Sequence, residues 1–374
     1  MSPNQQTYTH KARHSILWRL HLDAPLILGL MLLLGYGLIV LYSAGSESAG
    51  LVERQMVRLG LAFIVMLVMA QIPPRILAAW ALPLYTIGIL MLLAVTFFGV
   101  TGKGAQRWLD LGFFRFQPSE IMKLALPMIL AWYLKDRTLP PRKRDIIIMT
   151  LLIVVPTYLI FKQPDLGTSL LIAASGMFVL VLAGLSWKFI FWLGVAGASI
   201  APFAWNYLLR EYQQDRIKIF LNPELDPLGK GYHIIQSKIA IGSGGFYGKG
   251  WLEGTQSQLE FLPERHTDFI FSVLGEELGF FGVLLLILMY GFVIGRGMFI
   301  GVQAQDTFGR LLAGAITLTF FVYLFVNIGM VTGLLPVVGL PLPMISYGGT
   351  AMVTMMSSMG MLMSIHTHRR LHAT

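Results

Sequence analysis

The chain has 374 residues, of which 55% are hydrophobic and 13% are charged, and its formal net charge is +9. Soluble globular domains carry about 25% charged residues, so this composition excludes a water-soluble globule. The sequence contains no cysteine, which excludes disulfides, thiolate metal sites and thiol catalysis.

The N-terminal segment, residues 1–24, is polar and basic and precedes the first apolar stretch. It contains Lys11, Arg13 and Arg19 and has no small-residue cleavage site. We therefore expect no signal peptide, and we interpret the segment as cytoplasmic.

Apolar stretches of about 20 residues, each long enough to cross a bilayer, follow one another along the chain. Charged residues and Pro/Gly-rich points separate ten of them. We predict an all-α, polytopic membrane protein with ten transmembrane helices in a single membrane domain, residues 25–366. The predicted spans are 25–44, 54–72, 76–99, 118–134, 146–162, 165–184, 187–209, 268–295, 311–333 and 342–365.

Basic residues in short loops indicate the cytoplasmic side of a membrane protein. Five of them lie between Lys135 and Arg144, after the fourth span. This places both termini, including the tail 367–374, in the cytoplasm. The cytoplasmic side then has a net charge of +10 and the outer side −1. Topology thus explains the positive charge, and we expect no nucleic-acid partner.

The longest loop, residues 210–267, connects spans seven and eight on the outer side, and loops of such length are usually functional. We expect short helices within it, for example Tyr232–Ile241. Its glycine-rich run, 241–250, does not match a phosphate loop, because Ser243 replaces the first glycine and Gly250 the final hydroxyl residue. We interpret it as a turn that allows close approach of a bulky ligand or a partner.

Three ionisable residues lie near the ends of predicted spans. Glu120 and Lys123 are three residues apart, so on a helix they share a face and can pair. Charges within a span face a protein interior or a wet cavity, so the pair is either a structural lock or the wall of an active cavity. Asp165 follows Pro164 between spans five and six. We expect it to cap the next helix and to face the same cavity.

Four ionisable groups occur within five residues at the start of span eight. We expect Thr267 to be the N-cap and Asp268 to lie in the first turn of this helix. Ser272, Gly275 and Glu276 follow on the same face and form a small, polar stripe that looks interior-facing. By residue type alone, a helix-dipole acid is the more frequent role for Asp268, and a catalytic acid or base is the alternative.

Prolines and glycines are frequent between residues 335 and 350, just before and within the start of the last predicted span. Broken helix backbone at membrane depth is tolerated only inside protein or along a wet cavity. We therefore expect this segment, with Ser346, to line the same site.

Six motifs, taken in chain order, resemble the SEDS family (shape, elongation, division and sporulation). The resemblance runs from about residue 20 to the C-terminus, and overall likeness favours an elongation-type member. It implies a ten-span fold and a peptidoglycan glycosyltransferase that polymerises lipid II at the outer face of the bacterial inner membrane. The motifs are Gly104–Leu109, Gln117–Glu120, Gln163–Thr168, Gly231–Lys238, Pro263–Phe269 and Ser346–Gly349.

The resemblance also implies roles for residues. The outer-loop aspartate of the family falls on Asp268, and its Glu–Lys pair falls on Glu120 and Lys123. Asp268 then suits the general base that takes the proton from the sugar 4-hydroxyl, with Glu120, Lys123, Asp165 and Ser346 as the supporting cavity. Basic groups stabilise the leaving undecaprenyl pyrophosphate. Candidates for binding it or the rest of the substrate are Arg107, Trp108, Arg216, Lys238, Arg265 and His266.

The expected partners are lipid II, the nascent glycan strand, a class B penicillin-binding transpeptidase and other membrane proteins of the elongation complex. A divalent cation, Mg²⁺ or Mn²⁺, is a candidate cofactor, with Asp165 or Glu120 as oxygen ligands. Two alternative functions stay open, a lipid II flippase and a noncatalytic scaffold for the transpeptidase. The flippase is disfavoured because the ionisable residues cluster at the outer edge, whereas alternating-access sites lie near the midplane.

Overall fold

The structure is a computed structural model that describes residues 20–368, apart from 103–104, 111, 113–114, 208, 210, 227–228, 260 and 263. Several residues named above therefore lie outside the described part of the chain. They are Lys11, Arg13, Arg19, Gly104, Pro263 and tail residues 369–374.

A helix lies at each of the ten segments predicted to span the membrane. Five of these helices, α3, α5, α7, α13 and α14, are long and apolar enough to cross a bilayer, and α8 is a shorter apolar helix. The chain is therefore an all-α, multi-pass membrane protein. The bounds are α3 (Ala24–Ala44), α4 (Ala49–Gln71), α5 (Pro74–Phe98), α6 (Pro118–Leu134), α7 (Lys143–Lys162), α8 (Leu166–Leu182), α9 (Trp187–Tyr207), α13 (Ile270–Gln303), α14 (Thr307–Val331) and α15 (Thr350–Thr367).

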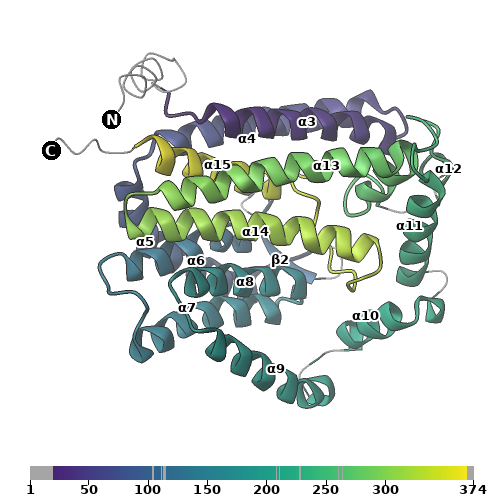
Figure 1. The fold of residues 1–374 in the computed structure, drawn as a ribbon. Coiled ribbons are helices and arrows are strands. Elements are labelled where there is room, and N and C mark those ends of the chain that lie inside the picture. The colour runs from purple at the N-terminus through teal and green to yellow at the C-terminus, as the bar shows by residue number, and fades with distance from the viewer. Residues whose placement is uncertain are drawn as a thin grey trace.

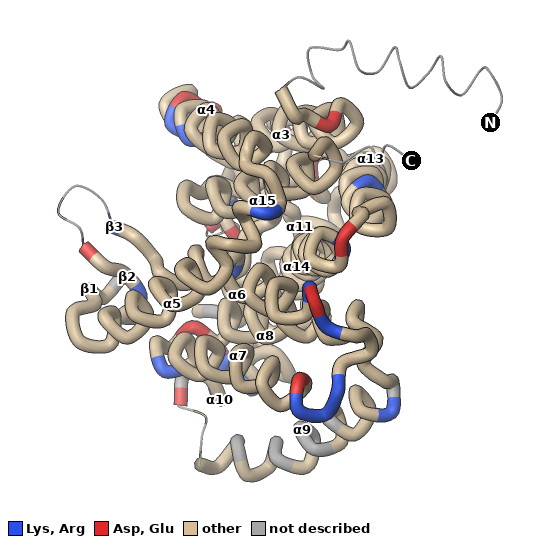
Figure 2. The backbone as a smooth tube through the Cα atoms, turned by 90° about the vertical axis from the view of Figure 1, so that its left-hand side faces the viewer, with Lys and Arg blue, Asp and Glu red and all other residues tan. Residues whose placement is uncertain are grey.

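The helices run side by side, with the start of α3 and the end of α15 at one end of the bundle and the elements of the long loop 210–267 at the other (Figure 1). Those elements are α10 (Glu211–Leu221), the 3-10 turn η1 (Pro223–Leu225), α11 (Lys230–Gly244) and α12 (Thr255–Gln258). The helix predicted at 232–241 is thus confirmed within α11. Viewed from the end that holds the start of α3 and the end of α15, most of the helical backbone carries no charged residue (Figure 2).

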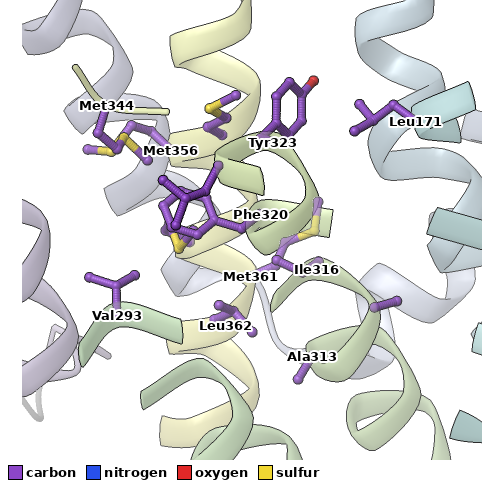
Figure 3. Close-up of a cluster of buried hydrophobic side chains, with 14 of the residues drawn as sticks. Leu171, Val293, Ala313, Ile316, Phe320, Tyr323, Met344, Met356, Met361 and Leu362 are labelled. Atoms are coloured by element: carbon purple, nitrogen blue, oxygen red, sulfur yellow. The ribbon is translucent and has the colours of Figure 1, made fainter. Parts of the chain in front are cut away.

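Buried apolar side chains from several helices form one core. Figure 3 shows part of it, with Leu171 of α8, Val293 of α13, Phe320 of α14 and Met356 of α15. The unbranched methionines fill irregular gaps between these helices. Other large apolar residues, such as Leu288, point outward and are exposed, as suits helices that face lipid.

Three short strands add an element that the sequence analysis did not anticipate. They are β1 (Val100–Gly102), β2 (Ala105–Asp110) and β3 (Arg115–Phe116), paired antiparallel in this order between α5 and α6. Strands of two to six residues are too short to give a clear alternating pattern.

Several helices begin at residues other than those predicted, and two of these differences bear on the site. The last helix begins at Thr350 and not at 342, because Pro343 has no N–H to donate within a helix and disfavours helical backbone in the residue before it. The eighth predicted span begins at Ile270 and not at 268, with Phe269 as its N-cap.

The glycine-rich run packs closely against α13 of its own chain. The helix α13 has a non-helical break at Gly279, where φ is +61°. The backbone N–H groups of Lys249 and Gly250 donate to the carbonyls of Glu276 and Glu277 just before this break, both at 3.0 Å. A Cβ at Gly248 would lie 2.1 Å from the Glu277 carbonyl oxygen, so only glycine fits there.

Candidate functional site

Asp268 lies in a turn directly before α13, which we call the Asp268 turn (residues 264–269). It is not in the first helical turn, and Thr267 is not the N-cap. Instead, the Thr267 hydroxyl donates to the Glu264 carboxylate at 2.7 Å. The Asp268 side chain is partly exposed, so it is accessible at the end of the helix bundle.

Three successive carbonyl groups fix the Asp268 turn. The carbonyl oxygens of residues 266, 267 and 268 accept hydrogen bonds from Tyr347 N (2.9 Å), Ser346 Oγ (2.6 Å) and Asn327 Nδ2 (3.0 Å). Two of these donors belong to the α14–α15 connector (residues 332–349), which contains the broken backbone predicted to line the site. The structure therefore brings Ser346 and the Asp268 turn together.

A glycine of the connector lies beside the Asp268 carboxylate. Gly339 has φ +76°, and a Cβ placed there would lie 3.4 Å from Asp268 Oδ2. This backbone conformation favours glycine. The backbone of Gly339 therefore bounds one side of the space around the carboxylate.

The polar stripe after Asp268 is buried, as expected, but it faces α11. Ser272 Oγ lies 2.8 Å from Ser237 Oγ, and the Glu276 carboxylate pairs with Lys249 at 2.7 Å. Glu276 also accepts from the backbone N–H of Gln256 at 2.9 Å. These contacts attach α11 and α12 to the start of α13 and leave Asp268 outside the stripe.

Arg265 braces the Asp268 turn against two other segments. Its guanidinium donates to the carbonyl oxygen of Ser257 in α12 and to Ser46 Oγ, at 2.6 Å, beyond the end of α3. Ser257 in turn donates from its backbone N–H to Glu276 at 3.3 Å. In this structure Arg265 is thus held by protein acceptors.

His266 lies against an aromatic and cationic group that sequence reasoning missed. Its ring meets Tyr347 edge-on, with centroids 5.8 Å apart. The guanidinium of Arg58, on α4, lies 4.4 Å from the centroid of the same tyrosine ring. The basic set near the Asp268 turn therefore includes Arg58, which no motif singled out.

Glu120 and Lys123 form the predicted ion pair. Lys123 Nζ lies 2.7 Å from Glu120 Oε1, and the side chains are 9% and 6% exposed, respectively. Lys123 also lies 5.4 Å from the centroid of the Tyr323 ring. Lys123 and Tyr323 line a small pocket between α6, α14 and α15. The pairing is thus confirmed, and the role of the pair in an active cavity stays a prediction.

Asp165 caps α8, as predicted, by accepting from Thr168 N at 3.2 Å. It also pairs with Arg107 of β2 at 3.4 Å and accepts from Gln117 at 3.3 Å. Arg107 donates in addition to the Pro164 carbonyl. The hairpin and the α7–α8 turn are therefore joined through Arg107 and Asp165.

The two candidate metal ligands are already engaged by basic groups. Asp165 is paired with Arg107, and Glu120 is paired with Lys123. Within the described ranges, no group of three or more His, Asp or Glu side chains is arranged to hold a metal ion. Asp165 and Glu120, as paired here, do not fit a resident metal site. A Mg²⁺ or Mn²⁺ cofactor stays a prediction.

The remaining candidate residues are spread around the same end of the molecule. Trp108 lies on β2 and lines an open pocket together with Arg115. Lys238 of α11 is exposed and lies against Gly333 of the connector, whose added Cβ would be 2.6 Å from Nζ. Arg216 is on α10, which packs against η1 and α11. The structure thus places Lys238 against the connector and leaves Arg216 and Trp108 as peripheral candidates.

An apolar cavity lies between α8, α14 and the connector. Its lining includes Gly167, Val326 and Leu340. Leu340 directly follows Gly339, which contacts Asp268, and Gly167 lies two residues after Asp165. Sequence reasoning did not find this cavity, because apolar residues from separate helices carry no motif.

Comparisons with known proteins give a consistent result. Residues 24–371 match the cell cycle protein family of FtsW, RodA and SpoVE. The chain is 53% identical to peptidoglycan glycosyltransferase MrdB of Escherichia coli K12 over 370 residues, which cover 99% of this chain and 98% of that protein.

Two solved structures have similar folds. A chain from a study of polymerization and crosslinking by a peptidoglycan synthase complex superimposes with a TM-score of 0.80 at 33% identity, covering 92% of this chain and 97% of that one. The rod shape determining protein RodA of Thermus thermophilus gives a TM-score of 0.70 at 28% identity, with coverage of 92% and 96%.

Proposed function

Because the chain belongs to the FtsW, RodA and SpoVE family, the SEDS family, and is a peptidoglycan glycosyltransferase, we propose that it polymerises lipid II for cell elongation. The reaction takes place at the outer face of the bacterial inner membrane. Ten transmembrane helices hold the site, with both termini in the cytoplasm and the loop 210–267 outside.

The arrangement of the chain supports this topology. The start of α3 and the end of α15 lie at one end of the bundle and α10, α11 and α12 at the other (Figure 1). The basic loop between α6 and α7 marks the cytoplasmic end by the positive-inside rule. The Asp268 turn then lies at the outer membrane edge.

The observation that carries the proposal is that one stretch of the connector lies beside a partly exposed carboxylate, through Gly339, and lines an apolar cavity, through Leu340. Lipid II joins a polyprenyl chain, which stays in the bilayer, to a sugar that must meet water. The cavity between α8 and α14 is lined by apolar residues and suits the part of the polyprenyl chain nearest the pyrophosphate. Asp268 lies beside it through Gly339 and Leu340, where the sugar would be.

In the proposed reaction, Asp268 is the general base. It accepts the proton of the acceptor sugar 4-hydroxyl as that oxygen attacks C1 of the donor sugar. The bond from C1 to the pyrophosphate oxygen breaks, and undecaprenyl pyrophosphate leaves with the electron pair. A single displacement of this kind inverts the configuration at C1.

Basic side chains around the Asp268 turn would stabilise the leaving pyrophosphate. Lys238 is the best placed, because it is exposed and lies beside the connector. Arg265 and Arg107 are engaged by protein acceptors in this structure, so we assign them first to holding the site together. Arg216, Trp108 and His266 stay candidates for contacts with the rest of the substrate.

We also propose that the chain works with a class B penicillin-binding transpeptidase and other elongation-complex membrane proteins. The support is the match to a chain from a peptidoglycan synthase complex that coordinates polymerization and crosslinking. Such a complex would hand the nascent glycan strand directly from polymerisation to crosslinking.

Purified protein supplied with fluorescent lipid II tests the proposal. We expect ladders of glycan chains in detergent. Detergent micelles have no second leaflet, so transport across a bilayer cannot account for this product. Transport of lipid II across vesicles without polymer would support the flippase instead. Polymer that forms only with a glycosyltransferase added in trans would indicate a scaffold.

A further inference from the structure

Asn327 of α14 joins the backbone of Asp268 to the backbone of the connector. Its side chain is completely buried. The amide nitrogen Nδ2 donates to the carbonyl oxygen of Asp268 at 3.0 Å and to that of Leu340 at 2.8 Å. One side chain therefore ties the residue that carries the carboxylate to the connector.

The orientation of this amide follows from its partners. Both neighbouring groups are carbonyl oxygens, which only accept, so the nitrogen and not the oxygen must face them. The other atom, Oδ1, is buried and has no hydrogen-bond partner among the described residues. A polar side chain inside a membrane helix is costly and marks a functional position more often than a packing one.

The hydrogen bond from Asn327 to the Leu340 carbonyl holds the connector backbone beside the Asp268 carboxylate. Leu340 follows Gly339, whose backbone lies against Asp268 Oδ2 in the left-handed region. If the Leu340 carbonyl were released, this turn would lose the contact that sets its distance from the carboxylate. If the Asp268 carbonyl were released, the carboxylate itself would lose its anchor.

We propose that Asn327 is a positioning residue that sets where the Asp268 carboxylate sits relative to the substrate hydroxyl. The inference rests on the proposed role of Asp268 as general base. A base must lie within about 2.6–3.2 Å of the proton donor's heavy atom, and a misplacement of about 1 Å costs about 10²-fold in rate. Asn327 itself touches no reacting atom.

The test compares Asn327→Leu, which removes both donors at similar size, with Thr317→Val. Thr317 is also buried on α14, but its hydroxyl donates only to Ala313 of the same helix. We expect Asn327→Leu to lower kcat for lipid II polymerisation by about 10–10²-fold, with KM within about twofold and a folded protein. Thr317→Val should keep the parent kcat. If the leucine variant does not fold, Asn327→Asp takes its place in the test. This substitution puts an oxygen in place of the donor nitrogen, and we expect the same loss of kcat.

A double-mutant cycle separates positioning from general stability. In the Asp268→Asn background, Asn327→Leu should change the residual rate by less than about twofold, because the group it positions no longer acts. Equal losses in both backgrounds, or a parent kcat for both Asn327 variants, would overturn the inference. An Asp268→Asn enzyme at the parent rate would instead overturn the proposed function, and the two failures are distinguishable.

Discussion

Ser346 holds Thr267 to the α14–α15 connector. Its hydroxyl donates to the Thr267 carbonyl at 2.6 Å and accepts from the Leu342 N–H at 2.8 Å. The side chain is 2% exposed. A single buried hydroxyl thus joins the residue before Asp268 to a proline-rich segment that cannot form a regular helix there.

Replacing Ser346 by alanine should weaken both stability and turnover. The change leaves a buried carbonyl and a buried N–H unpaired, which costs about 1–3 kcal/mol. We expect a lower unfolding midpoint in detergent and a several-fold lower rate of lipid II polymerisation. Ser357→Ala is the control, because its hydroxyl donates only to Val353 of its own helix. Equal effects of the two substitutions on turnover would show that Ser346 does not support the site.

The Glu120–Lys123 pair should behave as a coupled unit. Neutralising either residue leaves the other buried and unpaired, which costs about 3–5 kcal/mol. We expect Glu120→Gln and Lys123→Met each to lower the unfolding midpoint and the activity, and the exchanged pair, Lys at 120 and Glu at 123, to recover part of the loss. Additive effects of the single changes in a double-mutant cycle would show that the two side chains do not interact.

Cysteine labelling tests the topology against a background that contains no cysteine. Glu253, in the outer loop, and Asp136, in the basic loop, are both exposed. In intact spheroplasts, an impermeant maleimide should label Glu253→Cys and not Asp136→Cys, and it should label both after lysis. The opposite pattern would invert the orientation of the whole chain.

Acidification should destabilise the end of the bundle that holds His21. Burial, and to a lesser degree the charge of the nearby His368, lowers the pKa of His21 below its ordinary value of 6.5. The two rings stack with centroids 3.8 Å apart. Because the folded pKa is the lower one, the contribution of His21 to stability is present above pH 6.5 and is lost as the pH falls through and below that value.

His21→Gln provides the measurement for this pH effect. The unfolding midpoint of the parent should fall more steeply than that of the variant as the pH is lowered from about 7.5 to about 5. His233→Gln, on α11 in the outer loop, serves as a second histidine variant away from this end. If parent and His21→Gln have parallel profiles, the His21–His368 stack does not contribute to the acid sensitivity.

Local sequence patterns predicted the helices well, because a bilayer requires long apolar stretches and this requirement is visible in single segments. The i, i+3 spacing of Glu120 and Lys123 likewise predicted their ion pair. The spacing of Asp268 and Glu276 placed them on one helix face, yet α13 begins only at Ile270, so Asp268 lies before the helix and only Glu276 lies within it, where it pairs with Lys249.

Contacts between distant segments were not predictable in this way. Asn327 and Leu340 come from a helix and from broken backbone, and neither carries a charge or a motif that draws attention. The apolar cavity is assembled from α8, α14 and the connector, so its existence depends on packing alone. The glycine-rich run shows the same limit, because its close approach is to the broken backbone of α13.

The rate of lipid II polymerisation by purified Asp268→Asn protein tests the central claim most directly. Asparagine keeps the size and hydrogen-bonding capacity of the side chain but does not take up the hydroxyl proton. We expect turnover to fall by at least about 10²-fold, while folding, lipid II binding and association with the transpeptidase persist. Asp215→Asn, at an exposed position on α10, should keep the parent rate. A well-folded Asp268→Asn enzyme that polymerises lipid II at the parent rate would contradict the account, and His266 would become the next candidate base.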